Sequence, residues 1–391
     1  MESNALSLPN PFVMVDGTPV RSHAQWVQQR RPELLGVFAR YMYGVAPAAP
    51  GITATVSKTD PLLFDGLATL TEVTISINGL PAHAPRIHLA LFTPNRASAP
   101  APVFLGLNAV GNYAVVDHPS VTFNPQAWAN PEWAGAARGG QTHEWCVENT
   151  LRRGYAFATY HTSDIDADRP DFSDGIHPFY SPEALGCTAE ESWGTLRAWA
   201  WGLERCVDYL VTHSALDPKR ICLIGHSRLG KTVLLAGAID ERVALVVLHQ
   251  SGTGGCALSR GNDQETVQKI NDRFPHWFNG AFKKFNGREA ALPVDQHLLL
   301  ALVAPRAVLD TEGERDVWAN PPAALRALHA ADPVWKFLGA SGLHGDGLLS
   351  EPQTLAGNAV GKLLQYRCDT GHEMNLGYWN ISLDFADAVL G

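Results

Sequence analysis

A serine at a strand–helix junction is the residue best placed for chemistry in this sequence. The segment ICLIGHSRLGK (221–231) runs from an apolar strand through Gly225, His226 and Ser227 into a helix that begins RLGKTVLLAGA. This is the context of a nucleophile elbow, where the N–H groups and dipole of the helix N-terminus can stabilise an oxyanion. The second glycine falls at 230, one place later than G-x-S-x-G puts it, so the motif match is partial. The alternative is that Ser227 is only a helix N-cap.

A serine becomes a nucleophile only when a base and an acid reach it. In enzymes built around such an elbow, the chain order is nucleophile, acid, histidine. Asp316 follows the apolar strand RAVLD (306–310), and His372 follows the last apolar strand. We therefore predict that His372 takes the serine proton and that Asp316 fixes its tautomer and stabilises the imidazolium. Glu312 and Glu314 are alternatives for the acid, and any of the three could be a solvated loop charge.

Two cations beside the serine could bind a charged or polar substrate. Arg228 is a permanently charged, forked donor that suits an oxyanion or an anionic substrate, and its alternative is a salt bridge to a loop carboxylate. Lys231 stands four residues after Ser227 and hence on the same helix face, unless it is an ordinary exposed helix lysine. Together with His372 and Asp316, these residues predict an acyl hydrolase with cationic groups beside its nucleophile.

The apolar pattern predicts the elements that position these residues. Residues 21–46 indicate a helix, and three segments alternate apolar and polar residues as antiparallel strands do: 52–59, 68–78 and 86–94. Beyond residue 102 the strands are apolar throughout, which is typical of a parallel sheet covered on both faces: 103–107, 155–160, 221–224, 244–249, 306–310 and 362–367. The clearest helix is 190–212, in the place of a crossover helix.

We predict one α/β domain over residues 1–391, a three-layer sandwich around a mostly parallel sheet. Residues 1–100 add a helix and antiparallel strands to the sheet, and residues 101–391 form the catalytic core. In open α/β sheets the site lies at the carboxyl ends of the strands. We therefore expect the long loops at 108–150, 161–189 and 311–361 to build the site.

Composition argues against several other functions. The net charge of −9, the pI near 5.9 and the lack of a Lys/Arg-rich run argue against a nucleic-acid partner. The longest apolar run, near 298–305, is far shorter than the ~20 residues that a bilayer requires. The first residues, MESNALSLPNPF, lack the basic and then apolar pattern of a secretion signal.

Cysteine and histidine spacing does not predict a metal site. The six cysteines show no CxxC spacing, so free thiols are expected at Cys146, Cys187, Cys206, Cys222, Cys256 and Cys368. Among the 15 histidines, those in GLHGDG (342–347) and THEW (142–145) lack a second ligand at helical spacing, and we expect them to be ordinary loop residues.

Several blocks together resemble the bacterial glucuronoyl esterases, carbohydrate esterase family 15. The resemblance covers roughly residues 100–391 and rests on GHSRLGK, SGTGGCALSRGNDQETV, INDRFPHWF, LPVDQHLLLALVAPR, ERDVWANP, VFLGLN, RRGYAFATY, DGIHPFY and AWAWGLERCVDYL. It implies an α/β-hydrolase fold with a serine triad and no cofactor, and the family motif G-x-S-R-x-G-K accounts for Gly230. It also implies Ser227 as nucleophile, Arg228 as a side-chain donor to the oxyanion and His372 as general base.

The resemblance further implies a sugar site at Lys231, Glu265 and Trp318. From the residues alone, Trp318 could instead be packing and Glu265 an ordinary surface glutamate at the start of ETVQKIND. One departure concerns the acid, because many members place a glutamate before SGxGG where this chain has Gln250. An amide cannot stabilise an imidazolium by charge, which favours Asp316. Gln250 is counted with the substrate-binding residues because its amide could still orient a partner by hydrogen bonds.

The function predicted is a serine esterase that cleaves the ester between 4-O-methyl-glucuronic acid on glucuronoxylan and a lignin alcohol, through an acyl-enzyme. The substrate class comes from the resemblance. The alternatives are an esterase for acetylated sugars or other carboxylic esters, and a non-catalytic carbohydrate-binding relative, suggested by Gln250. We expect a monomer, secreted or periplasmic by resemblance, without nucleic-acid or membrane partners.

Overall fold

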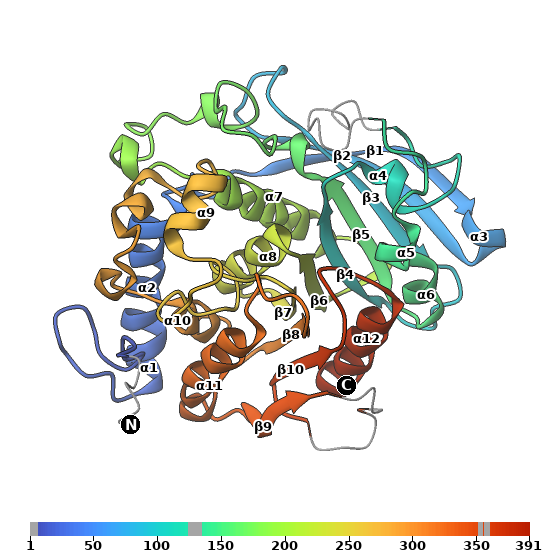
Figure 1. Ribbon diagram of the computed structural model, residues 1–391. Coiled ribbons are helices and arrows are strands. Elements are labelled where there is room, and N and C mark those ends of the chain that lie inside the picture. Colours follow the sequence, from blue (N-terminus) through green and yellow to red (C-terminus); the bar gives the residue numbers. More distant parts are fainter. Residues whose placement is uncertain (1–6, 124–134, 351–354, 356–359) are drawn as a thin grey trace.

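Ten strands of the protein form one sheet, in the order β1-β2-β3-β5-β4-β6-β7-β8-β10-β9 (Figure 1). The structure is a computed structural model that describes residues 7–123, 135–350, 355 and 360–391. The strands are β1 (Ile52–Leu62), β2 (Ala68–Ile77), β3 (Ile87–Pro94), β4 (Ala101–Asn108), β5 (Ala156–His161), β6 (Leu216–His226), β7 (Val243–His249), β8 (Ala307–Gly313), β9 (Leu343–Leu349) and β10 (Leu363–Cys368).

The strand pairing changes from antiparallel to parallel near the point where the sequence changes from alternating to continuous apolar runs. Strands β1, β2, β3 and β5 pair antiparallel in that order, whereas every pair from β5 through β4, β6, β7, β8 and β10 to β9 is parallel. In the parallel part, neighbouring residues of one strand enter opposite cores. On β6, Leu223 packs into one buried cluster while Cys222 and Ile224 pack into the other. Such double burial explains the continuous apolar runs and confirms the predicted α/β fold.

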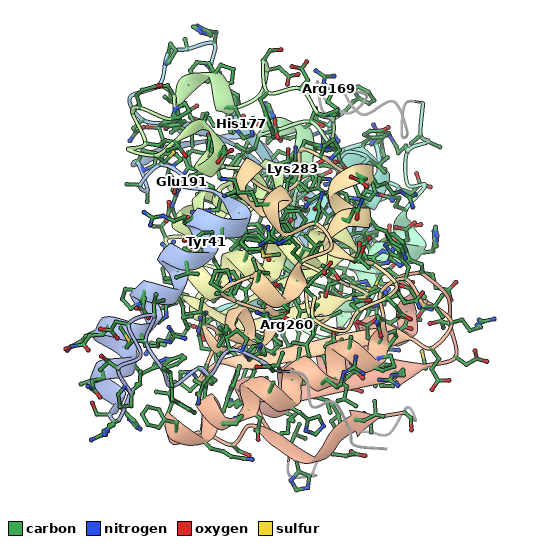
Figure 2. All side chains as sticks on the ribbon, turned by 60° about the vertical axis from the view of Figure 1, so that its left-hand side comes forward. Tyr41, Arg169, His177, Glu191, Arg260 and Lys283 are labelled. Atoms are coloured by element: carbon green, nitrogen blue, oxygen red, sulfur yellow. The ribbon has the colours of Figure 1, made fainter. Side chains whose placement is uncertain are left out.

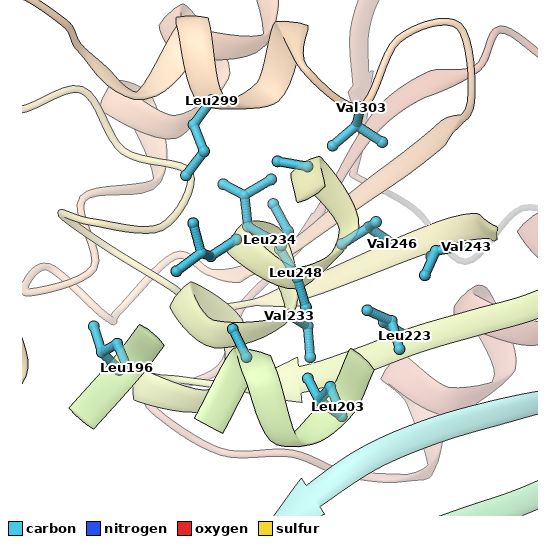
Figure 3. Close-up of a cluster of buried hydrophobic side chains, with 14 of the residues drawn as sticks. Leu196, Leu203, Leu223, Val233, Leu234, Val243, Val246, Leu248, Leu299 and Val303 are labelled. Atoms are coloured by element: carbon cyan, nitrogen blue, oxygen red, sulfur yellow. The ribbon is translucent and has the colours of Figure 1, made fainter. Parts of the chain in front are cut away.

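Helices cover both faces of the sheet (Figure 1). On one face lie α7 (Thr195–Leu210), α8 (Arg228–Ile239), α10 (Gln296–Ala301) and α11 (Pro321–Phe337), and Figure 3 shows Leu203 of α7, Val233 of α8, Leu299 of α10 and Leu248 of β7 in one buried cluster. On the other lie α12 (Leu376–Leu390), α6 (Val147–Arg152), α5 (Thr142–Trp145) and α4 (Asn112–Val115). The N-terminal helical run comprises α1 (His23–Gln25), η1 (Trp26–Arg30), α2 (Arg31–Phe38) and η2 (Ala39–Tyr43).

Short helical segments occupy the connections. They are α3 (Leu63–Gly66), η4 (Thr162–Asp164), η5 (His177–Phe179), η6 (Ala189–Glu191), α9 (Val267–Arg273), η7 (Gly280–Phe285) and η8 (Glu289–Ala291). Figure 2 shows the segment after β5, with Arg169 and His177 labelled, at one end of the molecule. Asp166 anchors this segment by accepting hydrogen bonds from Thr195 at the start of α7 (2.7 Å) and from His177 (3.2 Å). Within the described residues, none of the helices has the length and apolar character of a membrane span.

The predicted helix 190–212 and two of the predicted loops differ from the structure. The helix begins only at Thr195, because the backbone at 192–193 packs against Gly44, where an added Cβ would lie 2.1 Å from the Cα of Trp193. The segment 108–150, expected to be loop, contains α4, α5 and part of α6, and the segment 311–361 contains α11 and β9. The prolines of α11 and the glycines of β9, Gly345 and Gly347 at positive φ, hid both elements from the periodicity.

Candidate active site

Ser227 occupies a strained turn between β6 and α8. Its φ of 58° and ψ of −125° are unusual for a residue with a side chain, and such strain is concentrated at functional sites. The turn is tight enough to require glycine at 225, where a Cβ would lie 2.3 Å from the carbonyl oxygen of Leu229. The Ser227 side chain makes no capping hydrogen bond to α8. The plain N-cap alternative is therefore wrong, and the strand–turn–helix context is confirmed.

His372 and Asp316 meet at the same edge of the sheet. The Nδ1 atom of His372 lies 2.6 Å from Oδ2 of Asp316, whose other oxygen accepts from the backbone N–H of Ala319 (3.3 Å). The His372 ring is 4.5 Å from the ring of His226, the residue directly before Ser227. Asp316 is buried while His372 is 42% exposed, so the base stays open to a substrate. The predicted contact between the acid and the histidine is thus confirmed.

The alternative acids do not share this position. Glu314 is exposed, and no hydrogen bond or ion pair joins it to His372 among the described residues. Glu312 is fully buried, on the strand itself. Asp316 is the carboxylate that the loop after β8 brings to the histidine.

Arg228 is held by a carboxylate that we did not predict. Its Nη1 lies 2.5 Å from Oδ2 of Asp168, and its guanidinium stacks 5.0 Å from the ring of Trp277. Asp168 also accepts hydrogen bonds from His276 and Trp277, each at 2.8 Å. Burial acts to raise the pKa of Asp168, but the hydrogen bond from His276 and the charge of Arg228 outweigh it, so the pKa lies below its ordinary value. The salt bridge to a loop carboxylate is thus present, and one quarter of the Arg228 side chain remains exposed.

Lys231 and Glu265 form a buried ion pair next to the elbow. The Nζ atom of Lys231 lies 3.0 Å from Oε2 of Glu265, 2.8 Å from the carbonyl oxygen of Ser251 and 2.7 Å from that of Thr253. An ammonium has three hydrogens, and these oxygens can accept all of them. The prediction that Lys231 bonds directly to a sugar therefore finds no support in this geometry, and the exposed-lysine and surface-glutamate alternatives are wrong because both side chains are only 3% exposed.

Trp318 completes this cluster. Its indole N–H donates to Oε1 of Glu265 (3.0 Å), and the Arg273 guanidinium lies 5.9 Å from its ring. Burial lowers the pKa of Lys231 and raises that of Glu265, and each partner's charge partly offsets the effect of burial on the other. The cluster therefore depends on both charges being present together.

We expect Lys231→Met to destabilise the protein by about 3–5 kcal/mol, because it leaves the Glu265 carboxylate buried without a cation. Urea unfolding at pH 7 measures the change. Lys269→Met is the control, since Lys269 is an exposed lysine that reaches only backbone carbonyls, and it should change the stability by less than about 0.5 kcal/mol. Equal stability of the Lys231 variant and the wild type would contradict the structural role of the pair.

Gln250 does not face a substrate. It is 2% exposed, its Nε2 donates to the carbonyl of Gly371 (2.5 Å) and its Oε1 lies 3.0 Å from Nε2 of His226. The prediction that Gln250 contacts the substrate is therefore not supported. Its partners are structural groups next to Ser227 and His372.

Two carboxyls, those of Asp310 and Glu312, lie buried on β8. Oδ2 of Asp310 accepts from Gln365 (2.7 Å), and the carboxyls of Asp310 and Glu312 interact with each other. Burial raises the pKa of Asp310 to about 6. Burial also raises the pKa of Glu312 well above its usual range, and the neighbouring charges of Asp310 and Asp316 add to this effect.

The Asp310→Asn variant should be more stable than the wild type at pH 8 and lose this advantage in acid. Folded Asp310 binds its proton more tightly than the unfolded chain does, so wild-type stability falls as pH rises from the ordinary value of 3.8 through about 6. Urea midpoints at pH 4 to 8 test this expectation. Asp263→Asn, at an exposed carboxylate, should show no such trend. A difference between Asp310→Asn and the wild type that does not vary with pH would exclude the raised pKa.

The described residues contain no cluster of metal ligands and no disulfide. Among residues 7–123, 135–350, 355 and 360–391, no three His, Cys, Asp or Glu side chains gather in a way that could hold a metal ion. The six cysteines are free thiols, and Cys206, Cys222 and Cys256 are buried.

Comparisons with known proteins place the chain in a family. A family model described as glucuronyl esterase, fungi, matches residues 139–339. Carbohydrate esterase MZ0003, from an unknown prokaryotic organism, is 37% identical over 97% of this chain and 89% of its own length. The 4-O-methyl-glucuronoyl methylesterase 1 of Phanerochaete chrysosporium is 31% identical over 88% of this chain, which spans 64% of that protein. A glucuronoyl esterase structure from Solibacter usitatus matches with a TM-score of 0.89 and 36% identity over 99% of each chain. The chain therefore belongs to the glucuronoyl esterase family, carbohydrate esterase family 15, and is an esterase.

Proposed function

We propose that the protein hydrolyses the ester between 4-O-methyl-glucuronic acid on glucuronoxylan and a lignin alcohol, through an acyl-enzyme on Ser227. The observation that carries the proposal is the 2.6 Å contact between His372 and Asp316 beside the strained turn of Ser227. Acyl transfer requires a histidine that is oriented by a carboxylate and lies near a serine hydroxyl. Half-buried Ser227 directly follows His226, whose ring is 4.5 Å from that of His372.

In the first half-reaction, Nε2 of His372 takes the Ser227 proton while Oγ attacks the ester carbonyl carbon. Asp316 keeps the ring proton on Nδ1, so Nε2 is free to act as the base, and it stabilises the imidazolium that forms. N–H groups at the start of α8 and the Arg228 side chain would stabilise the oxyanion. The tetrahedral intermediate collapses when His372 returns the proton to the leaving alcohol.

In the second half-reaction, His372 takes a proton from water, and the hydroxide attacks the acyl-enzyme. Collapse of the second tetrahedral intermediate releases the uronate and returns the proton to Ser227. All groups are then restored, and neither half-reaction needs a cofactor.

The uronate assignment is supported by the relatives, among them one named 4-O-methyl-glucuronoyl methylesterase 1. In this proposal Trp318 and Glu265 shape the sugar site, with Lys231 holding Glu265 in place. Residues 1–391 act as one catalytic domain and as a monomer. Since a cell-wall polymer cannot enter a cell, the site of action is outside the cytoplasm.

Hydrolysis rates with benzyl glucuronoate and 4-nitrophenyl acetate test the substrate class. The expected result is a higher kcat/KM for the uronate ester. A preference for the acetate by a large factor would instead support an esterase for acetylated sugars or other carboxylic esters. Absence of turnover with both esters would support the non-catalytic carbohydrate-binding alternative.

A further inference from the structure

We infer that His249 and Gln250 are positioning residues that hold the loop of His372 from both sides. They are consecutive residues at the end of β7, and they bond to the two backbone carbonyls that flank His372 in the chain. Nε2 of Gln250 lies 2.5 Å from the carbonyl oxygen of Gly371, and Nε2 of His249 lies 2.8 Å from that of Glu373. The inference rests on the proposed function, in which His372 is the base.

The hydrogen-bond network determines which atoms donate. A carbonyl oxygen only accepts, so the amide NH₂ of Gln250 must point to Gly371, which leaves Oε1 to accept from Nε2–H of His226. For the same reason Nε2 of His249 carries its proton, and Nδ1 can accept from the Thr311 hydroxyl at 2.8 Å. Burial lowers the pKa of His249 to about 4 and that of His226 well below its usual value, so both rings are neutral at neutral pH.

Both side chains are held rigidly. His249 is fully buried and Gln250 is 2% exposed. Gln250 has a positive φ of 48°, which is a strained conformation for a residue with a side chain. The hydrogen bond from its backbone N–H to the Thr311 carbonyl (2.9 Å) holds this conformation. Gly313 leaves just enough space for the contact, because a Cβ there would lie 2.6 Å from Nε2 of Gln250. Rotation of the amide away from Gly371 would leave buried polar groups without partners.

We call His249 and Gln250 the clamp. The clamp also connects the loop of the base, His372, to the turn of the nucleophile, Ser227. The His226 ring lies between two others, 4.7 Å from the His249 ring and 4.5 Å from the His372 ring. His226 directly precedes Ser227, so Gln250 joins the turn of the nucleophile to the loop of the base through one amide group. The titratable or charged groups near His372 are Asp316, His226 and His249, with Arg228 beyond His226.

Three variants test the clamp. Gln250→Met keeps the side-chain volume and removes both hydrogen bonds of the amide. Gln250→Glu keeps an acceptor for His226 but loses the donor to the Gly371 carbonyl. His249→Phe keeps a ring but loses the donor to the Glu373 carbonyl. Since a misplacement of about 1 Å can cost about 10²-fold in rate, we expect each variant to lower kcat for benzyl glucuronoate by about 10- to 100-fold, with KM within about twofold.

A matched control separates this role from general stability. Gln296 is another buried glutamine, whose Nε2 donates to the Gly255 carbonyl (2.9 Å) from α10. Gln296→Leu should lower the melting temperature without lowering kcat. Wild-type kcat in Gln250→Met and His249→Phe would overturn the clamp, as would a Gln250→Glu variant at least as active as the wild type. If Ser227→Ala also kept its activity, the proposed function itself would fail; if Ser227→Ala is inactive, only the clamp fails.

Discussion

Replacement of Ser227 by alanine should lower kcat for benzyl glucuronoate by about 10³-fold or more, because no other group can form the acyl-enzyme. The fold should survive the change, since the Ser227 side chain makes no capping hydrogen bond to α8. The measurement is kcat under saturating substrate, together with a circular dichroism spectrum and a melting curve of the variant. Residual turnover near the uncatalysed rate is the expected outcome.

Ser214→Ala is the matched control. Ser214 is exposed, in the turn between α7 and β6 at the opposite edge of the sheet, so its loss should leave kcat unchanged. Activity of Ser227→Ala within a few-fold of the wild type would show that this serine is not the nucleophile. It would also remove the reason for the strained backbone at this position.

Replacement of Asp316 by asparagine should lower kcat by about 10² to 10⁴-fold through the tautomer of His372. Oδ1 of Asp316 accepts from the Ala319 N–H, so an asparagine that keeps this bond presents its NH₂ to Nδ1 of His372. Nδ1 must then accept, and the ring proton moves to Nε2, which can no longer take the proton of Ser227. The protonated ring also loses its charge partner, which removes the stabilisation of the imidazolium in the transition state.

Glu314→Gln is the control for Asp316→Asn, because Glu314 stands in the same loop but is exposed. We expect wild-type kcat. A larger loss in Glu314→Gln than in Asp316→Asn would transfer the role of the acid to Glu314. Full activity in both variants would mean that His372 works without a carboxylate from this loop.

Local patterns were enough for the strands of the parallel sheet except β9, for the turn at Ser227 and for the chain order that points to Asp316 and His372. A strand buried on both faces is mostly apolar at successive positions, and a tight turn into a helix needs glycine where side chains would collide, so both leave marks in consecutive residues. The ends of β8 and β10 are neighbours in a parallel sheet, which brings Asp316 and His372 together once the strand order is known.

Only the tertiary structure decided what the remaining polar groups contact. Asp168 meets Arg228 across 60 residues of chain, Glu265 meets Lys231 across 34, and Gln250 meets Gly371 across 121. The type of a polar residue allows many hydrogen-bond partners. The sequence shows that Gln250 lacks the charge of a glutamate, but it does not show that its amide donates to the Gly371 carbonyl. Such contacts depend on how separate loops pack over the sheet edge, because a buried polar group takes the partner that the surrounding fold places within reach.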